Sequence, residues 1–102
     1  MEYNKLVRDK IPEIIKKSNL KPVTHKAGKK EFEQKLIEKL AEEIEEFKRN
    51  SSVEELADLL EIIYAICDLK GIDKRKIELI RQKKANEKGA FKKKTILERT
   101  DG

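Results

Sequence analysis

The sequence predicts an all-α fold: a helical hairpin core with a third helix, assembled into an oligomeric helical bundle. Three observations predict it. Apolar residues recur at helical spacing in two adjacent stretches, a short serine turn joins these stretches, and the second stretch is apolar on most sides. The chain has 102 residues, so we expect residues 1–102 to form one domain.

The part of the chain before the hairpin is expected to be mostly irregular. Residues 1–10 are predicted to be irregular or extended. Pro12 suits the first turn of a short helix that runs to about Ser18, because its missing N–H costs nothing there. Residues 19–30 contain turn-forming residues and are predicted to form a loop, with a short strand as an alternative.

The first helix of the hairpin is predicted from Glu31 to about Arg49. Its apolar residues are spaced by four, four, four and three positions, which places them on one face of a helix. These residues are Phe32, Leu36, Leu40, Ile44 and Phe47.

The second helix of the hairpin is predicted from Val53 to Leu69. Ser52 with Glu55 three residues later resembles a capping box that opens it, and Gly71 is expected to cap its end. Because it is apolar on most sides, we expect this helix to be largely buried.

A third helix is predicted from Asp73 to about Lys88, with Ile77 and Ile80 facing inward. Gly89 is expected to stop it. The tail that follows is predicted to be extended at best.

Composition excludes several classes of protein. Charged residues make up 44% of the chain and the net charge is only +5, so nucleic acid is an unlikely partner despite the pI of about 9.3. Cys67 is the one cysteine, which excludes an internal disulfide and a multi-cysteine zinc site. No apolar run is long enough for a membrane span, and the N-terminus lacks the apolar stretch of a signal peptide. A cytoplasmic protein is therefore expected.

Four acidic residues lie near apolar positions on the two predicted helices. A helical wheel places Glu43 inside the apolar face of the first helix and Glu46 on its border. On the wheel of the second helix, Asp58 lies close to Ile62, and Glu55 lies on the far side of Ile62 from Asp58. Antiparallel packing of the hairpin would bring these two i,i+3 pairs together near the turn.

Carboxylates crowded in a partly buried site require raised pKa values, basic partners or divalent cations. Oxygen-only ligands favour magnesium, manganese or calcium over zinc. The alternative is that these acids pair with lysines such as Lys39 along the rim of a helix.

Three other conspicuous residues are expected to be structural. His25 stands alone in a basic loop and is not expected to bind a metal. Cys67 is predicted to pack in the core, whereas Tyr64 is either a core residue or stacks on a base.

Three motifs resemble those of the MazG-like, all-α nucleoside triphosphate pyrophosphohydrolases, a superfamily that includes phosphoribosyl-ATP pyrophosphohydrolase. Its E-E-x-x-E and E-x-x-D signature is matched by residues 42–46 and 55–58. Residues 4–12, NKLVRDKIP, resemble the opening motif of a small single-domain branch, and residues 83–97 resemble its closing segment.

The resemblance implies magnesium-dependent cleavage between the α- and β-phosphates, which yields a nucleoside monophosphate and pyrophosphate; manganese is a possible substitute. It implies metal ligands at Glu43, Glu46, Glu55 and Asp58. It implies a further ligand or a water-orienting base at Glu42. It also implies phosphate contacts from Lys5, Arg8, Lys10 and Lys84.

The expected partners are a nucleoside triphosphate and further copies of the chain, as a homodimer or a dimer of dimers. Three other functions stay open: a phosphoribosyl-ATP pyrophosphohydrolase, a basic helical nucleic-acid-binding module, and a helical oligomerisation protein without activity. The house-cleaning of nucleotide pools and a metabolic role are both compatible with the sequence.

Overall fold

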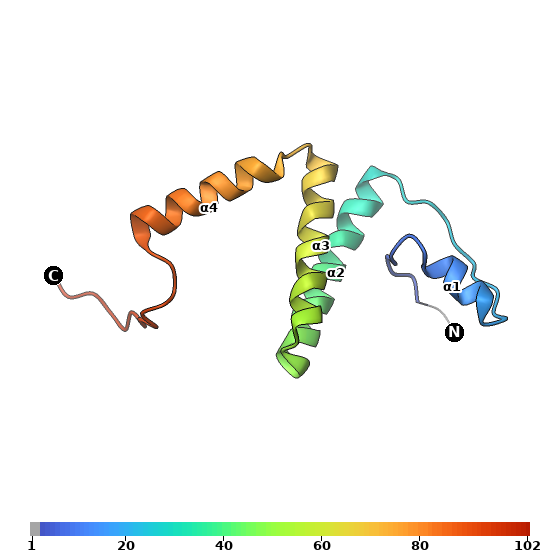
Figure 1. Ribbon diagram of the computed structural model, residues 1–102, viewed down its shortest axis with the longest axis horizontal. Helices are drawn as coiled ribbons and strands as arrows, with labels where there is room; N and C mark the ends of the chain where they lie inside the picture. The colour runs from blue at the N-terminus through green and yellow to red at the C-terminus, as the bar shows by residue number, and fades with distance from the viewer. Residues whose placement is uncertain (1–2) are drawn as a thin grey trace. The chain divides into compact units, whose positions relative to one another are not determined.

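A computed structural model describes residues 3–102, and this part of the chain is all-helical with four helices (Figure 1). The helices are α1 (Ile11–Lys17), α2 (Lys29–Asn50), α3 (Val53–Lys70) and α4 (Lys74–Lys88). The all-α prediction is confirmed, and each predicted helix is found within two residues of its expected ends. The described residues contain no strand, so residues 19–28 form a loop without the alternative strand.

The chain divides into two compact units, and each is described by itself. The first ends at Gly71 and contains α1, α2 and α3; the second runs from Ile72 to Gly102 and contains α4. The expectation of one domain stays a prediction. Within the described residues, no helix combines the length and the apolar character needed to cross a membrane.

Local caps explain where the hairpin helices meet. Ser51 follows the last residue of α2 and is its C-cap, in the left-handed conformation (φ 44°). Its N–H donates to the Phe47 carbonyl at 2.7 Å. The Ser52 hydroxyl accepts from the Glu55 N–H at 3.2 Å and caps α3, as the capping-box spacing predicts. Gly71 ends α3 at φ 67°, a conformation that is costly for a residue with a Cβ.

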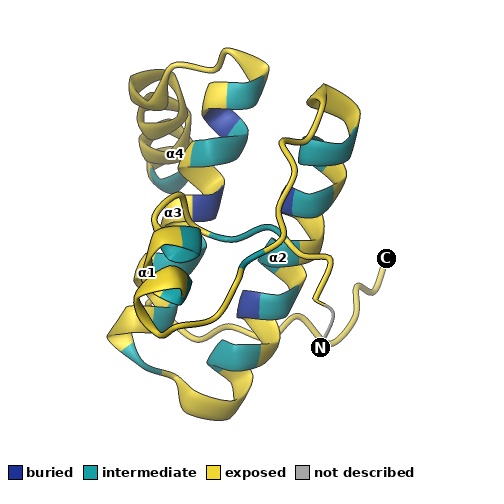
Figure 2. Ribbon diagram, turned by 90° about the vertical axis from the view of Figure 1, so that its right-hand side faces the viewer, coloured by how far each residue is buried: buried dark blue, intermediate teal, exposed yellow. Residues whose placement is uncertain are grey.

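The core of the first unit lies between α2 and α3, which pack against each other as the predicted hairpin. The buried apolar residues are Leu36, Ile62 and Cys67. Figure 2 shows that the buried positions lie on α2 and α3. Lys70 near the end of α3 pairs with Glu33 near the start of α2 at 2.6 Å, as antiparallel helices require. The predicted core position of Cys67 is confirmed.

Within the first unit α3 is only partly buried, so the burial expected for it stays a prediction. An exposed apolar stripe remains along it, made of Val53, Leu56, Leu60 and Ile63, whose spacing of three, four and three places them on one helix face. Tyr64 is also 40% exposed, so it is not a core residue of the single chain. One neighbouring helix covers only one side of α3.

The N-terminal segment, residues 3–10, is tied to both hairpin helices by polar contacts. The Lys35 ammonium on α2 donates to the Asn4 carbonyl at 2.7 Å. Lys5 pairs with Glu42 on α2 at 3.4 Å, and Arg8 pairs with Asp58 on α3 at 2.8 Å. The segment itself has no helix or strand, as predicted.

In the second unit, Asp73 caps α4 by accepting from the Arg75 N–H at 2.8 Å, and Gly89 follows its last residue. No residue of α4 is buried. Ile77 and Ile80, expected to face inward, are 38% and 46% exposed, and that expectation stays a prediction. Residues 89–102 contain no helix or strand, as expected for the tail.

Candidate metal centre

Three carboxylates converge near the turn of the hairpin. Glu43 comes from α2, and Glu55 and Asp58 come from successive turns of α3. One carboxylate oxygen from each lies within 4.8 Å of the others. The Ser52 cap places the first turn of α3 at the end of α2, so Glu55 and Asp58 face Glu43 across the hairpin.

Burial makes this cluster costly without a cation. Glu43 is only 9% exposed, which confirms its predicted place on the apolar face of α2. Oxygen Oε2 of Glu55 is buried and accepts no hydrogen bond. A buried carboxylate oxygen without a partner loses its hydration without replacement, and a bound cation would supply the missing interaction.

The crowding perturbs the titration of Glu43. Burial raises the pKa of Glu43 to about 7, and a hydrogen bond with Glu55 and the negative charges of Asp58 and Glu55 act in the same direction. The positive charge of Lys39 acts in the opposite direction. A large fraction of Glu43 is therefore protonated at neutral pH when no cation is bound.

Arg8 supplies the one direct basic partner of the cluster within the described residues. Its guanidinium pairs with Asp58, and both side chains are partly exposed, at 59% and 37%. Neither Glu43 nor Glu55 takes part in an ion pair of the described chain.

The structure does not bring all the predicted site residues together. Glu46 pairs with Arg49 on its own helix and is not part of the cluster of three carboxylates. Glu42 lies beside the cluster in sequence and pairs with Lys5. Lys10 is exposed just before α1.

Lys84 is an exposed residue of α4 in the second unit. Its predicted contact with phosphate stays a prediction.

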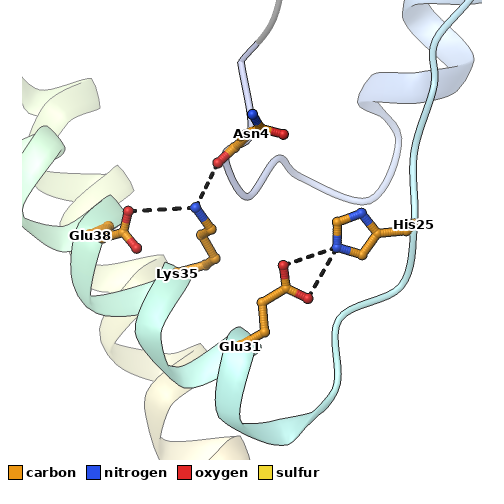
Figure 3. A network of polar contacts seen from close by, with 5 residues as sticks. All are labelled: Asn4, His25, Glu31, Lys35 and Glu38. Atoms are coloured by element: carbon orange, nitrogen blue, oxygen red, sulfur yellow. Dashed lines mark hydrogen bonds and ion pairs between the residues drawn. The ribbon is translucent and has the colours of Figure 1, made fainter.

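Two polar contacts were missed by the sequence analysis (Figure 3). His25 does not stand alone: its Nε2 lies 3.0 Å from both carboxylate oxygens of Glu31 at the start of α2. The contact between Lys35 and the Asn4 carbonyl joins residues 31 positions apart. No local pattern indicates either contact, because both depend on how a loop or an extended segment returns to α2.

No protein-family model matches the chain, and no curated protein or solved structure is significantly similar to it. The function therefore rests on the residues and their geometry.

The three carboxylates fit a hard divalent cation. Their donors are all oxygens, which suits magnesium or manganese, and the orphaned Glu55 Oε2 is available as a ligand. Three protein ligands also leave coordination positions for water and for oxygens of a substrate.

The raised pKa of Glu43 predicts an unusual dependence of stability on pH. The ordinary value is 4.5 and the folded value is about 7, so the folded state binds more protons between these values. The free energy of unfolding of the metal-free protein should therefore fall as the pH rises from 5 to 7, by about 2 kcal/mol. Urea denaturation at several pH values in the presence of a chelator measures it.

Glu43→Gln should remove most of this slope, and the exposed Glu45→Gln on the same helix should retain it. A wild-type protein equally stable at pH 5 and pH 7 would contradict the assignment.

Proposed function

We propose that this protein is a divalent-metal-dependent nucleoside triphosphate pyrophosphohydrolase of the MazG-like, all-α type. The observation that carries the proposal is the convergence of Glu43, Glu55 and Asp58 around a buried, unpartnered carboxylate oxygen. These three residues belong to the E-E-x-x-E and E-x-x-D segments. The proposed reaction comes from the resemblance of those segments to the superfamily. The convergence of the carboxylates in the hairpin supports this proposal.

The proposed reaction adds water across the anhydride that links the α- and β-phosphates. The water oxygen forms a bond to the α-phosphorus, the bond to the bridging oxygen breaks, and pyrophosphate leaves with the electron pair. Bound magnesium or manganese would neutralise phosphate charge and lower the pKa of water. Glu43, Glu55 and Asp58 would hold the cation, and Glu46 would join them only by leaving Arg49.

Glu42 is the proposed acceptor of the proton from water. Glu42 directly precedes Glu43 in α2. Its side chain is 40% exposed and therefore accessible to solvent. It pairs with Lys5 at 3.4 Å, and a carboxylate within reach of a water molecule can act as a general base.

The N-terminal segment would supply cations for the phosphates. Arg8 already lies at the cluster, at 2.8 Å from Asp58, and its planar guanidinium can bind two phosphate oxygens at once. Lys5 lies beside Glu42 and would make a second contact. Lys10, just before α1, and Lys84 on α4 are proposed as further phosphate contacts.

Asp58→Asn tests the metal centre. It should lower magnesium-dependent release of pyrophosphate by about a hundredfold or more, because a ligand charge is lost. The fold should survive, since removing one charge relieves repulsion with Glu43. A panel of nucleoside triphosphates, with pyrophosphate and orthophosphate measured separately, provides the assay.

The matched control is Glu61→Gln, an exposed acid one turn further along α3, which should keep normal activity. Full activity of Asp58→Asn would refute the assignment of this ligand. Release of orthophosphate alone by the wild type would refute the reaction.

Arg8→Ala tests whether the guanidinium acts on the substrate or only anchors the N-terminal segment. Loss of a charge-assisted hydrogen bond to phosphate should reduce kcat/KM about tenfold to hundredfold. Thermal stability should change little, because the ion pair with Asp58 is partly exposed. Arg99→Ala, which removes an exposed arginine paired with Asp101, should leave kcat/KM unchanged. Reduced stability with normal turnover would leave Arg8 a structural residue.

We also propose that the protein assembles through the exposed apolar stripe of α3. Leu56 and Leu60 are about half exposed, at 51% and 48%, and Val53 is 79% exposed. Burial stabilises by roughly 25 cal/mol per Å² of apolar surface, so a contiguous stripe favours association. A second copy supplies the same stripe under two-fold symmetry, as a homodimer or a dimer of dimers.

Leu60→Glu should therefore convert the protein to a monomer, which sedimentation at micromolar concentration measures. Leu20→Glu, at an exposed leucine in the loop before α2, should leave the assembly intact. A compact wild-type monomer would contradict this assembly.

A further inference from the structure

A pocket of about 300 Å³ lies between the N-terminal segment and α2. It is lined by Tyr3, Asn4, Lys5, Leu6, Lys35, Glu38, Lys39 and Glu42. None of the three clustered carboxylates lines it, so it is a separate site from the metal centre. We refer to it as the lysine pocket.

Cations outnumber acids in the lining of the lysine pocket. Lys5, Lys35 and Lys39 face Glu38 and Glu42. Lys35 is the most shielded of the paired lysines, with a side chain only 26% exposed, so its charge is less screened by water. Its ammonium is held by the Asn4 carbonyl at 2.7 Å and by Glu38 at 3.6 Å (Figure 3).

Two lysines of the lysine pocket lie on the same face of α2 as Glu43 of the metal centre. Lys35, Lys39 and Glu43 are spaced by four residues, so each lies about 6 Å along the helix axis from the next. The positive charge of Lys39 also acts to lower the pKa of Glu43, as expected for residues four positions apart on a helix. A chain of phosphates starting at the metal centre would therefore pass Lys39 and then Lys35.

The lining suits phosphate better than a nucleobase. A base needs a flat apolar or aromatic surface, and Tyr3, the one aromatic residue of the lining, is 68% exposed. Lysine ammonium groups are effective partners for phosphate oxygens. Glu38 is 53% exposed, so its side chain can turn to solvent when an anion replaces it beside Lys35.

We propose that the lysine pocket binds the β- and γ-phosphates of the nucleotide, with Lys39 and Lys35 as their main contacts. This inference rests on the proposed function, because it assumes that the α-phosphate lies at the carboxylate cluster. It assigns substrate contacts to two lysines of α2 and places the pyrophosphate leaving group on the N-terminal side of the metal centre.

Calorimetric titration of the full chain with inorganic tripolyphosphate, without divalent metal, tests the pocket directly. Lys39→Gln and Lys35→Gln should each weaken binding about tenfold, the effect of one charge-assisted hydrogen bond. Lys48→Gln is the matched control: Lys48 is on the same helix and also pairs with the acid three residues away, but it lies outside the pocket. It should bind as the wild type does.

Glu38→Gln provides a variant with the opposite expected effect, because it removes the acid that competes for Lys35. It should bind tripolyphosphate more tightly. A nucleoside triphosphate should displace tripolyphosphate, whereas the monophosphate should not. Equal weakening by Lys48→Gln, or equal displacement by the monophosphate, would overturn the proposal.

The failure of this inference is distinguishable from failure of the proposed function. A wild-type protein that releases no pyrophosphate from any nucleotide refutes the function. Normal pyrophosphate release, combined with wild-type tripolyphosphate affinity in both Lys39→Gln and Lys35→Gln, refutes the lysine pocket alone.

Discussion

The crowding of three carboxylates at the closed end of a thin helical hairpin is the constraint on which the rest of this structure depends. Glu43 is nine-tenths buried, and a buried oxygen of Glu55 has no partner. The raised pKa of Glu43 shows one response to that crowding, protonation, and the Arg8 ion pair with Asp58 shows another. Both are partial, because a proton and one exposed guanidinium cannot satisfy three carboxylates. The proposed divalent cation would satisfy them together.

The same hairpin buries only a small apolar core. Leu36, Ile62 and Cys67 are its buried apolar residues, while one face of α3 stays exposed. Two packed helices can cover only one side of each other, and a short chain buries a small share of its surface. The proposed assembly would cover the exposed apolar surface along α3. The proposed metal centre would neutralise the buried charge near the turn.

The N-terminal segment connects the two proposed parts of the site. Asn4 and Lys5 of this segment contact α2, and Arg8 contacts α3. These ion pairs are partly exposed, so each contributes little to stability, roughly 0–1 kcal/mol. Weak pairs can exchange a carboxylate for a phosphate oxygen at small cost. In the proposed enzyme, the cations that balance the acids before the substrate binds are therefore suitable contacts for the substrate itself.

The sequence by itself determined the helices and the exceptional position of Glu43, because caps such as Ser52 and the 3.6-residue period act over a few neighbouring residues. It did not determine which acids converge. Glu46 pairs with Arg49 on its own helix, while Asp58 meets Arg8 from 50 positions away. Only the tertiary structure decided this, because contacts between distant residues depend on how segments pack, which no local period specifies.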